Sequence, residues 1–217
     1  MSETAFTAAE IEAMFTNDGQ YKFARWNRPI APVVFGTDDE SLAVFKDAFA
    51  TVASLGDMRL AETDPELGAN FLIFFCAEWS ELKNVPYLTQ LLANVGNLVS
   101  ELEQSGANQY RSFSFDPKGA ITLCVLLLKY DDNMAQVSAQ ALATSQMAQA
   151  MLLWSKSAFL ETSPIGIIGA NNMAIVRPSV AALIRAAYDK TMPDTAGNTS
   201  HALRLETRVK QLMGDDS

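Results

Sequence analysis

The feature that most constrains the fold is a strongly apolar run at residues 120–130, in which only Thr122 and Lys129 are polar or charged. A run of strand length without polar alternation is typical of a strand that is buried on both faces. The residues before it, 116–119, read Asp-Pro-Lys-Gly and place proline and glycine where a β-turn favours them. Residues 110–115 set aromatic side chains between polar ones. This part of the chain therefore predicts a β-hairpin whose second strand lies inside a covered sheet.

The rest of the chain lacks the regular alternation of strand and helix that a parallel α/β fold shows. Residues 25–35 have strand content, but Pro29 and Pro32 cannot donate ladder hydrogen bonds and favour an edge position. Residues 71–79 are rich in aromatic side chains and predict a strand, whereas 163–173 are expected to form a loop. We therefore predict an α+β fold with one mixed, largely antiparallel sheet packed by several helices. Apolar residues recur with helical spacing at residues 8–15, 41–55, 85–104, 134–154, 178–188 and 200–213.

The chain length of 217 residues fits one large domain. Residues 191–199 contain Pro193 and Gly197 and are the only stretch with the composition of a linker. We expect three parts, in chain order: an N-terminal helical extension at 1–20, a single α+β domain at 21–195, and a C-terminal helix with an acidic tail at 196–217.

The formal net charge of −9 argues against nucleic acid as a partner, because the average surface repels a phosphate backbone. No run reaches the ~20 apolar residues that a membrane-spanning helix needs. The first residues show no signal peptide, so a soluble cytoplasmic protein is expected, or a periplasmic one if a signal peptide has been removed. The remaining partner class is another protein, and association between copies of the chain stays open.

The residues that usually carry enzyme chemistry are scarce. The single histidine, His201, cannot form an HExxH pair or a three-histidine zinc site, and we expect it to be exposed in the first turn of a helix. Cys76 and Cys124 lie in apolar runs and are expected to be buried thiols. No nucleotide-binding glycine motif is present, and the nearest pattern, at 166–170, predicts a turn. We expect no cofactor and no metal, although spatially paired carboxylates stay open.

The order of elements after the hairpin is similar to that of the metzincin type of zinc peptidase. A long helix follows the apolar strand, then a loop with a methionine, then a helix that ends in an aromatic residue. Short motifs also resemble a proteobacterial domain-of-unknown-function family (number 2927) over about residues 21–195. The motifs are Trp26-Asn27-Arg28-Pro29-Ile30, Ser145-Gln146-Met147-Ala148-Gln149-Ala150 and Ala187-Tyr188-Asp189.

This resemblance implies a zincin-like fold in which residues 139–153 form the active-site helix and 171–173 stand near the Met-turn. The helix is degenerate, because Thr144, Ser145 and Gln146 occupy the place of histidine and glutamate. Zinc would then have no imidazole ligand, and the attacking water would have no general base.

The favoured hypothesis is a non-catalytic protein that binds another protein. Its groove would lie between the strand at 71–79 and the helix at 145–149. Two alternatives remain: a hydrolase that uses Ser145, which needs a carboxylate or another base within hydrogen-bond reach, and a structural accessory subunit of a larger complex, which needs an exposed apolar patch. The residues expected to line the groove are Thr144, Ser145, Gln146, Gln149, Trp79 and Met173.

Overall fold

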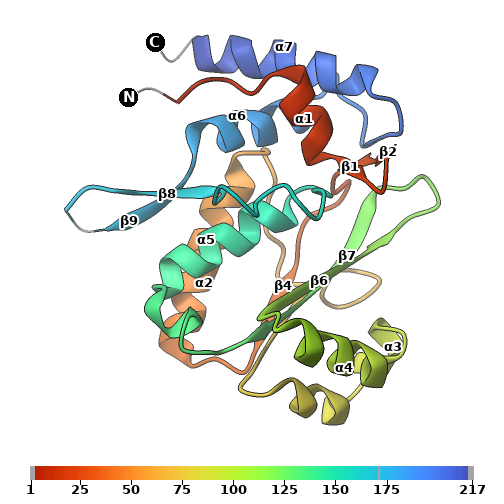
Figure 1. The fold of residues 1–217 in the computed structure, drawn as a ribbon, viewed down its shortest axis with the longest axis vertical. Coiled ribbons are helices and arrows are strands. Elements are labelled where there is room, and N and C mark those ends of the chain that lie inside the picture. Colours follow the sequence, from red (N-terminus) through yellow and green to blue (C-terminus); the bar gives the residue numbers. More distant parts are fainter. Residues whose placement is uncertain (1–2, 171, 215–217) are drawn as a thin grey trace.

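A four-stranded mixed sheet forms the centre of the computed structural model, which describes residues 3–170 and 172–214 (Figure 1). The fold is α+β, and its sheet is mixed, as expected. The prediction of a largely antiparallel sheet is wrong for this sheet, because two of its three pairings are parallel. Long helical connections join the parallel neighbours, and such crossovers return the chain in the same direction. The strand order is β4 (Pro32–Phe35), β5 (Phe71–Cys76), β7 (Ile121–Lys129) and β6 (Gln109–Phe115).

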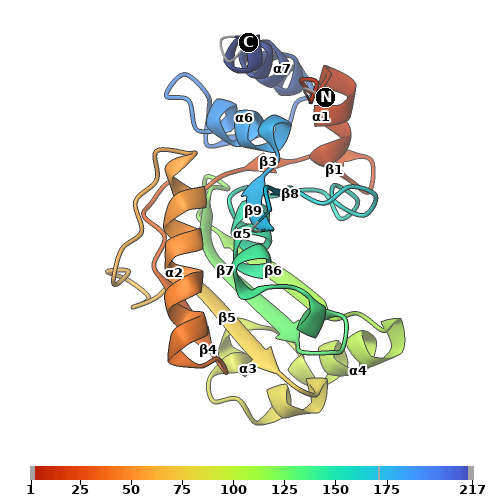
Figure 2. The ribbon, with the colours of Figure 1, turned by 90° about the vertical axis from the view of Figure 1, so that its left-hand side faces the viewer.

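Strand β7 is buried on both faces, as its sequence predicts. Cys124 and Leu126 face one hydrophobic cluster, and Val125 and Leu127 face a second. Helices cover both faces of the sheet, because neither row of apolar side chains can be left in water (Figure 2). The first face carries α2 (Asp39–Ser54) and α5 (Ala139–Ala150), and the second carries η1 (Trp79–Asn84), α3 (Leu88–Leu91) and α4 (Val95–Ser105).

Both ends of the chain pack on the first cluster. Ile11 and Phe15 at the N-terminal end and Leu205 and Val209 at the C-terminal end are fully buried in it. Residues 191–199, expected to be a linker, include a short strand that pairs with the segment before the main sheet. The elements of this region are α1 (Ala8–Met14), β1 (Thr16–Asn17), β2 (Gln20–Tyr21), β3 (Phe23–Ala24), α6 (Pro178–Ala187), β10 (Thr195–Ala196) and α7 (Ser200–Gly214). No helix within the described residues is long and apolar enough to cross a membrane.

Several predicted elements have different bounds. The helix expected at 85–104 is interrupted at Asn94, whose φ of 53° is left-handed and cannot continue a helix. The helix expected at 134–154 begins instead with η2 (Met134–Gln136), and α5 starts after Ser138, whose hydroxyl accepts from the Ala141 amide. The loop expected at 163–173 is a hairpin, β8 (Ile165–Ile168) and β9 (Met173–Val176); Asn171, placed near a Met-turn, lies outside the described residues.

His201 is buried, so the expectation of an exposed residue is wrong. It lies in the first turn of α7, but that turn faces the aromatic rings of Tyr21 and Phe23, and the residue is only 3% exposed. The Tyr21 hydroxyl lies 2.8 Å from Nδ1, and Nε2 has no partner. Burial lowers the pKa of His201 to about 4. Cys76 and Cys124 are buried free thiols, as predicted.

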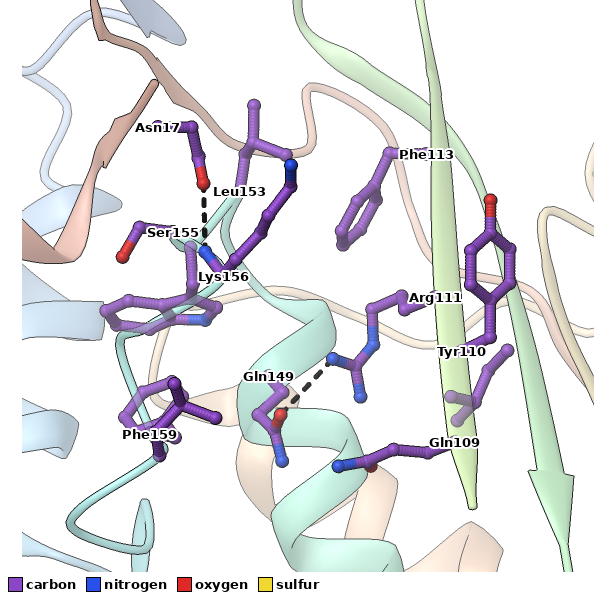
Figure 3. A pocket seen from close by; sticks show the side chains of 13 residues that line it. Asn17, Gln109, Tyr110, Arg111, Phe113, Gln149, Leu153, Ser155, Lys156 and Phe159 are labelled. Carbon is purple, nitrogen blue, oxygen red and sulfur yellow. Dashed lines mark hydrogen bonds between the residues drawn. The ribbon is translucent and has the colours of Figure 1, made fainter. Parts of the chain in front are cut away.

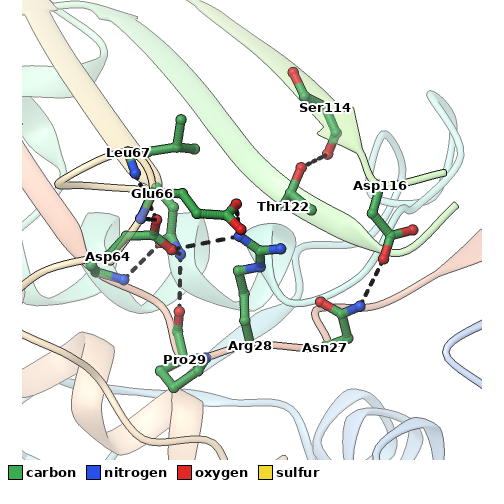
Figure 4. A network of polar contacts seen from close by, with 11 residues as sticks. Asn27, Arg28, Pro29, Asp64, Glu66, Leu67, Ser114, Asp116 and Thr122 are labelled. Carbon is green, nitrogen blue, oxygen red and sulfur yellow. Dashed lines mark hydrogen bonds and ion pairs between the residues drawn. The ribbon is translucent and has the colours of Figure 1, made fainter. Parts of the chain in front are cut away.

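A polar network with a buried centre, which we call the Asn70 cluster, ties the loop before β5 to the residues before β4; Figure 4 shows its members Asp64, Arg28 and Glu66. It consists of Asn70, Asp64, Arg28 and Glu66. The Asn70 side chain accepts from the Ala31 amide at 2.7 Å and donates to the Pro29 carbonyl and to Asp64. Asp64 also accepts the amides of Glu66 and Leu67, and the Arg28 guanidinium lies 3.9 Å away. The cluster therefore leaves no buried polar side-chain atom without a partner among its described residues.

Candidate functional site

The polar side of α5 meets the edge strand β6 in a second, partly buried network, which we call the Arg111 cluster (Figure 3). The Arg111 side chain leaves β6 toward α5, and its two terminal nitrogens donate to Gln149 Oε1, at 3.2 Å, and to Gln146 Oε1. Gln146 Nε2 donates to Gln109 Oε1 at 3.0 Å, and Gln149 Nε2 donates to Ser145 Oγ at 3.1 Å. Five side chains thus form one chain of hydrogen bonds between the strand and the helix.

The charge of Arg111 is not neutralised by a carboxylate within the described residues. Its hydrogen-bond acceptors are neutral amide oxygens, and its Nε is buried without any partner. Burial lowers the pKa of Arg111, and the neighbouring Cys124 thiol opposes this effect only in part. A partly buried cation without a counter-ion still costs free energy, and arginine cannot avoid that cost by losing its proton.

A cavity of about 530 Å³ opens between β6 and the segment that follows α5 (Figure 3). Two cationic residues and no acidic residue line it, although the whole chain carries a net charge of −9. Lys156 lies 3.7 Å from Asp18, but both side chains are more than 80% exposed, so this ion pair is weak. The lining residues are Asn17, Gln109, Tyr110, Arg111, Phe113, Leu126, Gln149, Leu153, Trp154, Ser155, Lys156, Phe159 and Leu160.

Strand β6 is the last strand of the sheet, so one of its edges has no neighbouring strand among the described residues. The Lys129 amide donates to the Asn108 carbonyl at 2.9 Å, and in an antiparallel ladder such bonds occur at every second residue. The backbone groups of Gln109, Arg111 and Phe113 therefore point away from β7, at the open edge of the sheet. Side chains share this period of two, so the same three residues turn their side chains toward α5.

Three side-chain donors fix the wall of the cavity where α5 ends. Trp26 Nε1 donates to the Ala150 carbonyl at 2.8 Å, Trp154 Nε1 to Ala148 at 3.1 Å, and the Tyr188 hydroxyl to Met151 at 2.7 Å. The last carbonyls of a helix lack partners within the helix, and these donors supply them. Residues from the beginning, middle and end of the chain therefore set the position of the segment after α5.

Four of the six predicted groove residues lie together on α5. Gln149 lines the cavity, and Gln146 is buried behind Arg111. Ser145 accepts the hydrogen bond from Gln149, whereas the Thr144 hydroxyl donates back to the Gln140 carbonyl within the helix. The polar patch therefore binds Arg111 and does not stand open as a row of free hydroxyls.

Trp79 and Met173 do not line this cavity. Trp79 belongs to the cluster on the opposite face of the sheet, where its indole donates to the Ala107 carbonyl at 2.9 Å. Met173 begins β9 and is 52% exposed. The cavity lies beside β6, and β7 separates β6 from the strand at 71–76 that the predicted groove used.

Arg111 and Lys156 were not among the predicted site residues. The sequence does contain a pattern that points to Arg111. Alternate residues of a strand face the same side, so Arg111 lies on the same face of β6 as Phe113 and Phe115, which face the main core. A charged residue on the apolar side of a strand is a candidate functional residue. Lys156 has no comparable signal, since its position depends on how the segment after α5 turns.

The structure gives the hydrolase alternative no support. Among the described residues, no carboxylate or imidazole forms a hydrogen bond with Ser145; its partner is the Gln149 amide. The described part of the chain also contains no group of three histidine, cysteine or acidic residues that could hold a metal ion.

Comparison of the chain with protein-family models, with curated proteins and with solved structures finds no match.

Proposed function

We propose that this chain is a non-catalytic protein with a degenerate metallopeptidase-like organisation that binds an extended segment of another protein. The observation that carries the proposal is the open edge of β6 beside the cavity. Gln109, Arg111 and Phe113 offer unused backbone groups there, and their side chains border a cavity of about 530 Å³. An extended peptide can add to such an edge as a further strand, with its alternate side chains entering the cavity.

The three motifs of the resemblance support the metallopeptidase-like part of the proposal. Trp26 and Tyr188, from the first and third motifs, donate to the Ala150 and Met151 carbonyls, and the second motif lies on α5. Motifs that are far apart in sequence thus meet at the end of one helix. On α5 itself, Gln146 binds Arg111 in the place where the resemblance would require a zinc ligand or a base.

Affinity selection tests this proposal. Short random synthetic peptides with free carboxyl ends are mixed with the full chain, and the retained peptides are identified by mass spectrometry. We expect retained peptides to bind the Gln109→Pro variant at least about tenfold more weakly, because proline removes the outward amide and its ring obstructs the new strand. The matched variant Gln109→Ala loses the side chain but keeps the amide, and it should bind clearly more tightly than Gln109→Pro.

Failure to retain any peptide, or equal binding to wild type and Gln109→Pro, would contradict strand addition. Cleavage of a retained peptide during incubation would contradict the non-catalytic assignment. Circular dichroism of both variants checks that the fold is kept.

One observation favours the second candidate, a structural accessory subunit. The hairpin of β8 and β9 projects from the body (Figure 1), and Ile167, Ile168 and Met173 on it are each more than 40% exposed. Gln140 on α5 holds strand β9 of the hairpin through both backbone groups of Ala174. Sedimentation of the wild type against the double variant Ile167→Ser, Met173→Ser tests this role: association that the variant abolishes supports it, and a wild-type monomer contradicts self-association.

A further inference from the structure

The Arg111 cluster carries an unbalanced positive charge. Two neutral glutamine oxygens accept from the guanidinium, Nε has no partner, and no described carboxylate forms an ion pair with it. By contrast, the guanidinium of Arg25 reaches the Asp194 carboxylate at 2.8 Å. An arginine that is held in place without an anion is prepared to receive one, and the planar guanidinium fits a carboxylate with two parallel hydrogen bonds.

The walls of the cavity limit what the anion can be attached to. Phe113, Leu153, Trp154 and Phe159 contribute apolar surface, and Phe159 packs edge-on against Trp154 with ring centroids 4.9 Å apart. An inorganic anion would leave this surface in contact with water. A carboxylate that carries an apolar group would cover it and gain the corresponding free energy.

Lys156 reinforces the preference for an anion at the cavity. Its ammonium group extends from the segment that closes the cavity, and no acidic residue lines the space between it and Arg111. In a chain of net charge −9, a local group of two cations attracts anions that the rest of the surface repels.

We infer that the cavity binds a carboxylate attached to an apolar group, with Arg111 as its main partner and Lys156 as an additional positive charge at the rim. The carboxylate can belong to a peptide with an apolar last residue or to a small free acid. The peptide source rests on the proposed function, because the strand along β6 would then lead its end to Arg111; the small-acid source does not.

Calorimetry with the full chain tests the inference with two matched pairs of probes. The first pair is N-acetylleucine and N-acetylleucinamide, and the second is one tetrapeptide that ends in leucine, as the free acid and as the amide. We expect each acid to bind at least about tenfold more tightly than its amide, because a charge-assisted pair is lost in the amide. This comparison uses only the wild-type protein, so it does not depend on any variant folding.

Variants then assign the effect to residues. Arg111→Met keeps the length of the side chain but removes the charge, and the preference for acid over amide should disappear. Arg111→Lys should recover only part of it, because an ammonium cannot form the two parallel bonds. Lys156→Gln should weaken acid binding by roughly two- to threefold, as expected for a screened surface charge. The matched variant Lys83→Gln, on the opposite side of the sheet, should leave it unchanged.

The outcomes separate this inference from the proposed function. Equal binding of acid and amide, or acid binding that survives Arg111→Met, overturns the carboxylate site, while peptide binding that is sensitive to Gln109→Pro would still stand. If the small acid binds and no peptide does, the carboxylate site stands and the proposed function falls. If neither acid binds, the inference is overturned.

Discussion

The Asn70 cluster and the Arg111 cluster each hold a charged side chain in a hydrogen-bonded network, but the two charges have different partners. Asp64 has two backbone amides, an asparagine amide and a nearby arginine. Arg111 has two neutral acceptors and an unpartnered Nε. A network in which every polar group has a partner stabilises the fold. A network with an unpartnered polar group can form a further favourable interaction when a ligand binds. The difference separates a structural network from a candidate binding site, and the four variants below test it.

The largest effect is expected from Asn70→Ala. The substitution removes three hydrogen bonds and leaves the Ala31 amide and one Asp64 oxygen buried with lost partners. The free energy of unfolding should fall by about 3–5 kcal/mol, measured by urea denaturation followed by circular dichroism. Asn27→Ala, which loses one exposed hydrogen bond to Asp116, is the control and should change it by less than about 0.5 kcal/mol. Similar losses of unfolding free energy in Asn70→Ala and Asn27→Ala would contradict a structural role for the Asn70 cluster.

Asp64→Asn should show a smaller loss and a changed pH dependence. Burial alone would raise the pKa of Asp64, but the amides of Leu67 and Glu66, the Asn70 side chain and Arg28 together lower it. The carboxylate therefore stabilises the fold above the pKa of an unfolded aspartate, and that contribution is lost as pH falls through the lower folded pKa. We expect the free energy of unfolding, measured by urea denaturation, to fall by about 1–3 kcal/mol at neutral pH. We also expect it to depend less on pH at acid pH than it does in the wild type (a flatter acid limb). An unchanged acid limb would contradict this.

His201 offers a third case for this comparison, because its Nε2 atom, like the Nε atom of Arg111, is buried and has no hydrogen-bond partner. Histidine can stay neutral when buried, and its pKa of about 4 reflects that. The unfolded histidine binds a proton below its ordinary pKa of 6.5 while the folded one does not, so the fold loses stability as pH falls from there toward 4. We expect a loss of about 2–3 kcal/mol over this range. His201→Gln should remove this part of the pH profile; identical profiles would contradict it.

The smallest effect is expected from Arg111→Met. Loss of an unneutralised, partly buried cation compensates for the lost hydrogen bonds to Gln146 and Gln149, so stability should stay within about 1 kcal/mol of the wild type or rise. Arg25→Met is the matched control: it breaks an ion pair with Asp194 and should cost about 1–3 kcal/mol. A larger loss for Arg111→Met than for the control, in urea denaturation, would make Arg111 a structural residue.

Local patterns predicted much of the fold. The apolar run at β7, Pro29 before β4 and Pro32 at its start, and the spacing of α6 and α7 describe segments whose burial is decided locally. The strand order and the parallel pairings depend on contacts between distant segments, which no local pattern contains. The interruption at Asn94 was missed for another reason, since the apolar period continues across it.

The site was predicted in part for the same reason. The Thr144–Gln146 stretch stands out as polar on an apolar helix, and α5 does use it to contact β6. Trp79 looked like a neighbour because it follows β5, but its chain turns to the other face of the sheet. Arg111 could have been found by strand parity, and Lys156 could not, since the turn after α5 is fixed by Trp26 and Tyr188.

The fastening of α5 at its C-terminal end has a consequence for affinity. The carbonyls of Ala148, Ala150 and Met151 are each held by a bulky side chain before any ligand arrives. Binding usually loses free energy to the ordering of loops and side chains. Here that loss falls mainly on the incoming molecule, so stiffening the ligand should increase its affinity more than further stiffening of the protein.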